Sequence, residues 1–160
     1  MAKIQDKGLN DYIKSIKRMG KVSDDIIRKG VYKGAGIIAD AIKDEIKDIP
    51  VDNGYGSPEK PISGISNRQK ADLIEGMGIA PIQEDSDFVN AKVGWDGYGR
   101  DKTKKYPKGV PNQVIARSVN SGTSFRKKNP FVNRAVTKSK KTAVKAMEDI
   151  IENEIKKEMK

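Results

Sequence analysis

The chain contains no cysteine and no histidine among its 160 residues. Without cysteine it can form neither a disulfide framework nor a thiolate nucleophile, which fits a cytosolic protein without requiring one. Without either residue, Ser-His and Cys-His catalytic pairs and imidazole or thiolate zinc sites are excluded. No G-x-x-x-x-G-K-[ST] phosphate-binding pattern occurs. We therefore expect no enzyme activity, no metal site and no cofactor.

Apolar residues are also scarce. Hydrophobic residues make up 36% of the chain and charged residues 34%, which favours an elongated helical protein or one that completes its burial against neighbouring subunits. No run reaches the ~18 apolar residues of a membrane span, and the N-terminus lacks the apolar core of a signal peptide. The expectation is a soluble protein without membrane contact, forming a single domain over residues 1–160.

The net charge of +10 is concentrated in one window. Residues 100–141 contain 13 Lys or Arg and a single acidic residue, whereas the chain on either side is close to neutral. Such a window attracts polyanions or an acidic protein surface, and the attraction weakens with salt. The alternative is a solvated loop kept soluble by lysine. The candidate interaction patch comprises Arg100, Lys102, Lys104, Lys105, Lys108, Arg126, Lys127 and Lys128.

The N-terminal third is predicted to be helical. An amphipathic helix is expected from about residue 8, with an apolar stripe formed by Leu9, Ile13, Ile16 and Met19. A long helix is expected over residues 23–49, with Ser23 as N-cap and Pro50 as its end. Three glycines inside the long helix indicate either close approach by another backbone, such as that of a neighbouring subunit, or a local bend: they are Gly30, Gly34 and Gly36. Its acidic residues are interpreted as a solvated face: Asp40, Asp44, Glu45 and Asp48.

The middle of the chain predicts a loop, a short helix and a β-hairpin. Turn-forming residues fill 50–65, and a capping box at 66–69 begins a helix that glycine ends at 76 or 78. Strands are expected over 77–83 and 89–95, joined by an acidic turn at 84–87. Trp95, the only tryptophan, is interpreted as part of the core or of a subunit interface.

The segment after the hairpin is rich in glycine, tyrosine and lysine. Aromatics interleaved with lysine over residues 96–109 bind single-stranded nucleic acid in some proteins, and a mobile loop is the alternative. Pro111 suits a helix start, although both helix and strand remain open for residues 111–121. A final long helix is predicted from Pro130 to about Lys157, with Asn129 as N-cap, packed along the helix of residues 23–49.

This order of elements resembles the tail-component family of tailed bacteriophages typified by the gene-ten product of the lambdoid phage HK-ninety-seven. Members tend to carry a Gly-Thr step followed by a Pro-Phe-x-x-x-Ala helix start. The corresponding residues here are Gly122, Thr123, Asn129, Pro130, Phe131 and Ala135. Members often have an acidic residue just before the Gly-Thr step, where this chain has Asn120 and Ser121.

The resemblance implies an α+β fold, in which long N- and C-terminal helices pack against a small antiparallel sheet or hairpin with long mobile loops. It implies a ring, a hexamer, at the neck or tail of a virion or defective prophage particle, made in the bacterial cytoplasm. There it would contact tail-tube, terminator or connector proteins, with its basic window facing an acidic ring or DNA in the lumen. The alternative function is a basic nucleic-acid-binding protein that uses residues 100–141.

Overall fold

A computed structural model describes residues 2–3, 6–17, 20, 22–85 and 88–158 of the chain. The fold is α+β and 55% helical, with long helices towards both ends, as predicted. The helices are α1 (Lys7–Lys17), α2 (Val22–Lys47), α3 (Asn67–Glu75), α4 (Asn112–Ser121) and α5 (Phe131–Glu158). The strands are β1 (Ala2–Lys3), β2 (Met77–Ile79), β3 (Gln83–Asp85), β4 (Phe88–Asn90) and β5 (Lys92–Trp95).

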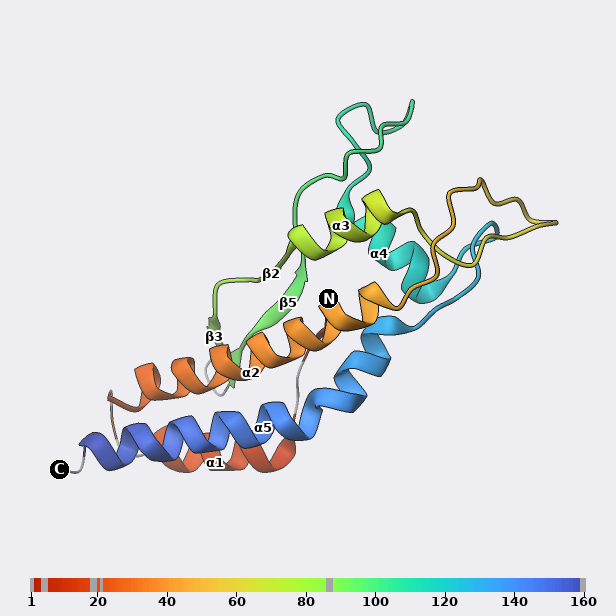
Figure 1. Cartoon of the computed structure of the whole chain (residues 1–160). Helices are drawn as coiled ribbons and strands as arrows, with labels where there is room; N and C mark the ends of the chain where they lie inside the picture. The colour runs from red at the N-terminus through yellow and green to blue at the C-terminus, as the bar shows by residue number, and fades with distance from the viewer. Residues whose placement is uncertain (1, 4–5, 18–19, 21, 86–87, 159–160) are drawn as a thin grey trace.

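Helices α2 and α5 run side by side along the length of the molecule and bury their apolar stripes against each other (Figure 1). Two of the helix glycines explain how closely they approach. A Cβ atom on Gly34 would overlap the Met147 side chain, and one on Gly30 would lie 2.8 Å from Cγ1 of Ile151. The close approach expected from the sequence is therefore made by α5 of the same chain rather than by a neighbouring subunit.

Ion pairs also join α2 to α5. The Glu45 carboxylate is only 6% exposed and accepts hydrogen bonds from Arg134, at 2.9 Å, and from Lys138. Glu45 therefore does not belong to a solvated face, because α5 covers it, whereas Asp40, Asp44 and Asp48 are exposed as predicted.

The predicted hairpin is confirmed, with a break in its middle. β5 lies between β1 and β2 and is antiparallel to both, while β3 and β4 continue the hairpin as a separate pair. Pro81 falls at the break between β2 and β3, because proline cannot donate to a ladder. Residues 84 and 85, expected in a turn, lie in β3, and β1 was not predicted.

The predicted helix starts need two corrections. Helix α2 begins at Val22, so Ser23 lies in its first turn, where its hydroxyl donates to the carbonyl of Gly20. Helix α5 begins at Phe131, and Asn129 does not cap it: the Asn129 side chain accepts a hydrogen bond from Arg134 at 2.7 Å. The stripe predicted for α1 includes buried Leu9 and Ile13; its remaining members Ile16 and Met19 lie outside the residues whose side chains are described.

Residues 111–121 are helical, which decides the alternative left open by the sequence. The predicted capping box of α3 is present, with Ser66 and Gln69 each bonding the other's backbone N–H, and Gly76 ends the helix. No helix within the described ranges combines the length and apolar content needed to cross a bilayer.

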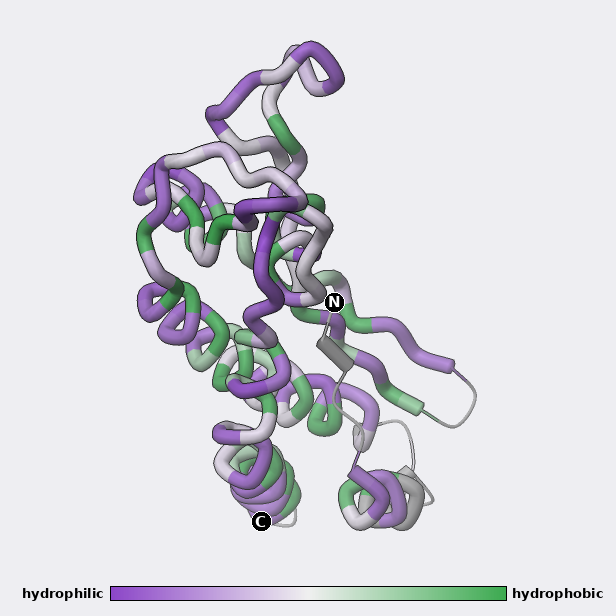
Figure 2. Tube along the Cα trace, turned by 90° about the vertical axis from the view of Figure 1, so that its right-hand side faces the viewer, coloured by the Kyte–Doolittle hydropathy of each residue, from purple (hydrophilic) through white to green (hydrophobic). Residues whose placement is uncertain are grey.

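Two segments project from the end of the helical layer (Figure 1). We call residues 51–64, after α2, the arm, and residues 98–110, between β5 and α4, the basic loop. The connector, residues 122–130, joins α4 to α5 and lies against the arm: Ile62 N–H donates to Phe125 at 3.0 Å, and Lys127 N–H donates to Ile62 at 2.8 Å. In Figure 2 the basic loop is coloured mostly hydrophilic or intermediate.

Candidate interaction surfaces

Arg126 was expected on the interaction patch, but it is only 9% exposed. Its guanidinium lies beneath the arm and donates to the carbonyl of Gly64. Burial lowers the pKa of Arg126, with the carboxylate of Asp52 acting in the opposite direction. Arg126 therefore joins the connector to the arm and is not an exposed part of the patch.

Arg100 is exposed, but its charge is already paired. Its Nε lies 2.6 Å from Oδ1 of Asp72, and its backbone N–H donates to Oδ2 of the same carboxylate at 2.8 Å. The Asp72 carboxylate, buried on α3, raises the pKa of Arg100. This pair fixes the base of the basic loop to α3.

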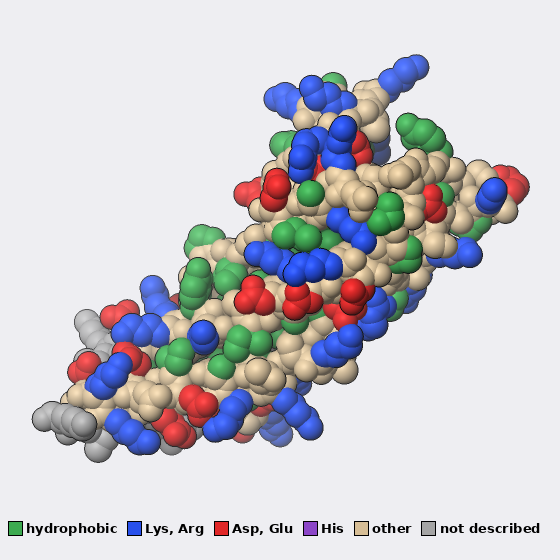
Figure 3. Space-filling view, viewed as in Figure 1, with side chains coloured by type: hydrophobic (Ala, Val, Ile, Leu, Met, Phe, Trp, Pro, Cys, Tyr) green, Lys and Arg blue, Asp and Glu red, His purple; other side chains and the backbone are tan. Residues whose placement is uncertain are grey.

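The remaining six members of the patch are exposed and fall into two groups on separate segments. Four lysines lie on the basic loop, where Figure 3 shows blue side chains gathered, and two lie on the connector. The ammonium of Lys105 sits 5.5 Å from the ring centroid of Tyr106. The six lysines are Lys102, Lys104, Lys105 and Lys108 on the loop, and Lys127 and Lys128 on the connector.

The residues singled out by the family resemblance have two different structural roles. Gly122 ends α4 with φ of 75°, and a Cβ atom there would lie 3.0 Å from the backbone nitrogen of Lys128, so this turn favours glycine. Thr123 follows in a tight turn closed by backbone hydrogen bonds with Arg126. Phe131 and Ala135, in contrast, lie on the core-facing side of α5 and are fully buried.

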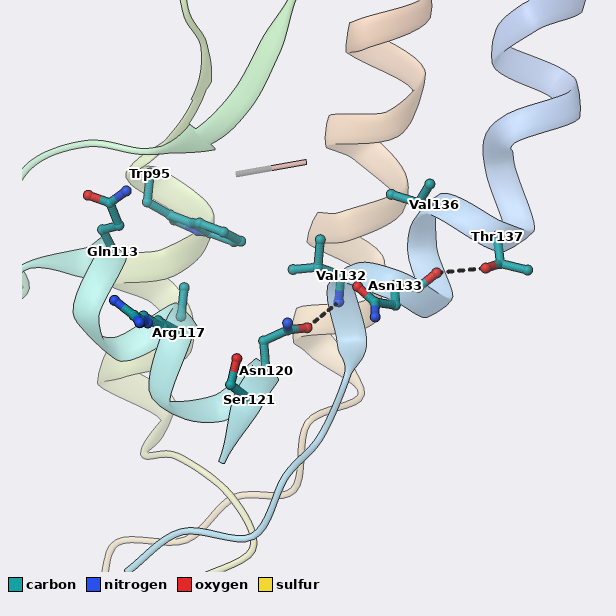
Figure 4. A pocket seen from close by; sticks show the side chains of 10 residues that line it. Trp95, Gln113, Arg117, Asn120, Ser121, Val132, Asn133, Val136 and Thr137 are labelled. Carbon is teal, nitrogen blue, oxygen red and sulfur yellow. Dashed lines mark hydrogen bonds between the residues drawn. The ribbon is translucent and has the colours of Figure 1, made fainter. Parts of the chain in front are cut away.

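A groove lies between α4 and the start of α5 (Figure 4). Its volume is about 650 Å³. Apolar side chains of Trp95, Val132 and Val136 form part of its surface, and polar groups surround them. The lining residues are Trp95, Gln113, Ala116, Arg117, Asn120, Ser121, Val132, Asn133, Val136 and Thr137.

The groove is held in shape by contacts at both of its sides. Trp95 donates its indole N–H to the carbonyl of Leu73 at 2.9 Å and packs edge-to-face on Phe131, with ring centroids 5.9 Å apart. Asn120 accepts from the backbone N–H of Val132 at 3.2 Å, which links α4 to α5 (Figure 4). Trp95 therefore contributes to the core through Phe131 and also lines an open surface.

The sequence contains only a weak indication of this groove. Phe131 and Ala135 form the buried stripe of α5, and Val132 and Val136 repeat the same spacing one position later, on an adjacent, half-buried face. The pattern identifies a second apolar face on α5, but it does not show that α4 leaves that face partly open.

A second groove, of about 960 Å³, lies between the arm, the start of α3 and the basic loop. Tyr55 and Phe125 line it together with charged groups of both signs, including Arg68 and Asp101, whose nearest polar atoms are 3.6 Å apart. Such mixed charge suits a protein partner better than a polyanion.

Within the described ranges, no group of three or more acidic side chains is placed to hold a metal ion. Comparison with protein-family models, with curated proteins and with solved structures found no match for the chain. The interpretation of its surfaces therefore rests on the residues and on their geometry.

Proposed function

We propose that the chain is a structural subunit of a bacteriophage or prophage particle that assembles with copies of itself into a ring at the tail or neck. The ring joins or completes the tail at the interface with the head. Its partners are tail-tube proteins, tail-terminator proteins or the proteins of the head–tail connector ring, and its site of action is the virion. The resemblance of the sequence to tail components supports this proposal, and the α+β fold with long terminal helices agrees with what that resemblance implied.

The projecting arm is the observation that carries the proposal. Tyr55, on the arm, is fully exposed, and Phe125 on the adjacent connector and Tyr98 on the basic loop are also exposed. Aromatic side chains on anchored projections contribute little to a monomer, whereas they are enriched at the centres of protein interfaces. The buried helix pair supplies a rigid base for these projections.

A basic nucleic-acid-binding protein is the second candidate function. Exposed lysines and the exposed Tyr98 on the basic loop favour it, because bases stack on aromatic rings within cationic surfaces. Two arginines of the expected patch weigh against it, since Arg126 is buried and Arg100 is paired with Asp72.

Light scattering of the purified chain, alone and mixed with a purified phage tail-tube protein, tests the proposal at low and high salt. A discrete ring, or a complex that forms only with the tail-tube protein, supports the structural role. A monomer that ignores the tail protein but binds DNA, with affinity that falls steeply with salt, contradicts it. Lys104→Glu with Lys105→Glu should then abolish DNA binding.

A further inference from the structure

We propose that the arm of one copy docks into the α4–α5 groove of the next copy, with Tyr55 placed against Trp95. The inference rests on the proposed ring assembly and names the surfaces that would form its interface. The occupant is a segment of a second copy of this chain, whose aromatic side chain, anchored backbone and charge suit the groove.

The arm presents Tyr55 from an anchored backbone. Gly54 and Gly56 flank it, and a Cβ atom on Gly56 would overlap the carbonyl oxygen of Phe125, so the arm lies directly against the connector. At its base, Asp52 N–H donates to Ile65 at 3.0 Å. Because the arm is already ordered, docking would cost less conformational entropy than ordering a free loop.

The groove has the composition that a tyrosine side chain requires. Trp95, Val132 and Val136 offer apolar contact for the ring, and the amides of Gln113 and Asn133 can exchange a hydrogen bond with the phenol hydroxyl. Tyrosine is suited to such sites because it has a large apolar body and one polar end.

The arm carries two carboxylates, Asp52 and Glu59, and one ammonium, Lys60, so its net charge is opposite in sign to that of the groove. Arg117 is the only charged residue among those lining the groove, and it forms no ion pair within the described part of the chain. On the arm, Glu59 is exposed, and hydrogen bonds from its own backbone N–H and from the Ser57 hydroxyl lower its pKa. A carboxylate carried by the arm therefore has an unpaired guanidinium available in the groove.

We place the contact between copies. The described residues that line the groove include none from the arm, whose Ile62 is hydrogen-bonded to Phe125 and Lys127 of its own connector instead. An arm that binds a different patch on its neighbour makes a head-to-tail contact, which generates closed rings or open filaments.

Disulfide trapping tests this directly, because the natural chain has no cysteine. Asn53→Cys, at an exposed position of the arm that leaves Tyr55 in place, and Val136→Cys are prepared separately, one with an affinity tag, then mixed at high protein concentration and mildly oxidised. The expected main product is the mixed dimer between the two variants, since a disulfide requires the two Cα atoms to approach within about 7 Å. Tyr32→Cys mixed with Val136→Cys is the matched control, because Tyr32 is exposed on α2 and does not line the groove.

A second measurement separates the interface from the fold. Tyr55→Ala and Arg117→Glu change exposed side chains, so both variants should keep the thermal midpoint of the natural chain at protein concentrations too low for assembly. At higher concentrations their self-association should be at least tenfold weaker. Retention of full self-association by both would overturn the docking. So would a mixed dimer no more abundant than the control, or an Asn53→Cys variant that couples mainly to itself.

Other outcomes distinguish this inference from the proposed function. A closed ring without the trapped contact overturns the docking and leaves the structural function in place. Trapped open chains that never close support the docking and contradict a ring. If the tail-tube protein or single-stranded DNA protects Val136→Cys from a thiol reagent while added copies of the chain do not, the groove has another occupant and the inference is wrong.

Discussion

Asn120, near the end of α4, accepts a hydrogen bond from the backbone N–H of Val132, in the first turn of α5, at 3.2 Å. The first N–H groups of a helix have no partner within it, and a side chain usually supplies one from the adjacent N-cap position. Here Asn120, on the preceding helix α4, supplies the acceptor. The backbone N–H of Asn129 also donates to Val119 at 2.8 Å, so both ends of the connector are held together.

Replacing Asn120 with alanine should lower the free energy of unfolding by about 1 kcal/mol, the usual cost of losing a helix cap. Urea unfolding monitored by circular dichroism measures the change. Asn133→Ala is the control, because Asn133 is exposed one position after Val132, and it should change the stability by less than about 0.5 kcal/mol. Equal effects of the two substitutions would mean that Asn120 does not cap α5.

Replacing either of two glycines of α2 with alanine should change the stability of the protein, in opposite directions at the two positions. Gly36→Ala should stabilise the protein by about 0.5–1 kcal/mol, since a Cβ atom there meets nothing within 4 Å and alanine is the better helix former. Gly34→Ala should destabilise it by about 1–3 kcal/mol, because the added Cβ overlaps the buried Met147. Thermal unfolding of the pair decides whether α2 and α5 pack as closely as described.

Glu45 should make stability depend on pH in the acid range. The hydrogen bond from Lys138, supported by Arg134, lowers the pKa of the Glu45 carboxyl against the opposing effect of burial. A carboxyl whose pKa is lower in the folded than in the unfolded state stabilises above the unfolded value, about 4.3, and that contribution is lost as pH falls through the folded pKa.

Glu45→Gln should therefore lower the free energy of unfolding at pH 7 by about 1 kcal/mol, a value kept small because both partner cations are exposed. The difference from the natural chain should shrink as the pH falls below about 4.3, the unfolded value, and Glu45 is protonated. Urea midpoints across this range measure it. Asp40→Asn, on the exposed face of the same helix, is the control, and a constant difference across the range would contradict the prediction.

Two neighbouring cations on the connector, Arg126 and Lys127, should differ sharply in how much they contribute to stability. Arg126→Ala removes the buried guanidinium that donates to the Gly64 carbonyl, and we expect a loss of about 1–3 kcal/mol of stability. Lys127→Ala alters an exposed side chain and should change stability by less than about 0.5 kcal/mol. Chemical unfolding of both variants tests this; similar values would mean that Arg126 does not anchor the arm.

Local patterns predicted most of the secondary structure, because they depend on residues close together in the chain. The apolar steps of α2 and α5, the capping box at Ser66 and Gln69 and the alternation in β5 each predicted an observed element. Short or irregular features were missed. Nothing in the sequence marks β1, and its two residues form a strand only because β5 lies beside them.

By itself, the sequence determined the α+β class, the two long helices, the hairpin and the location of the positive charge, since periodicity, proline and composition act locally. Only the tertiary structure decided which residues share a surface. It placed Arg126 in the interior, paired Glu45 with α5 and Arg100 with Asp72, and gave the cap of α5 to Asn120 instead of Asn129. Each of these depends on a partner distant in the chain, whose position is set by the packing of helices and loops.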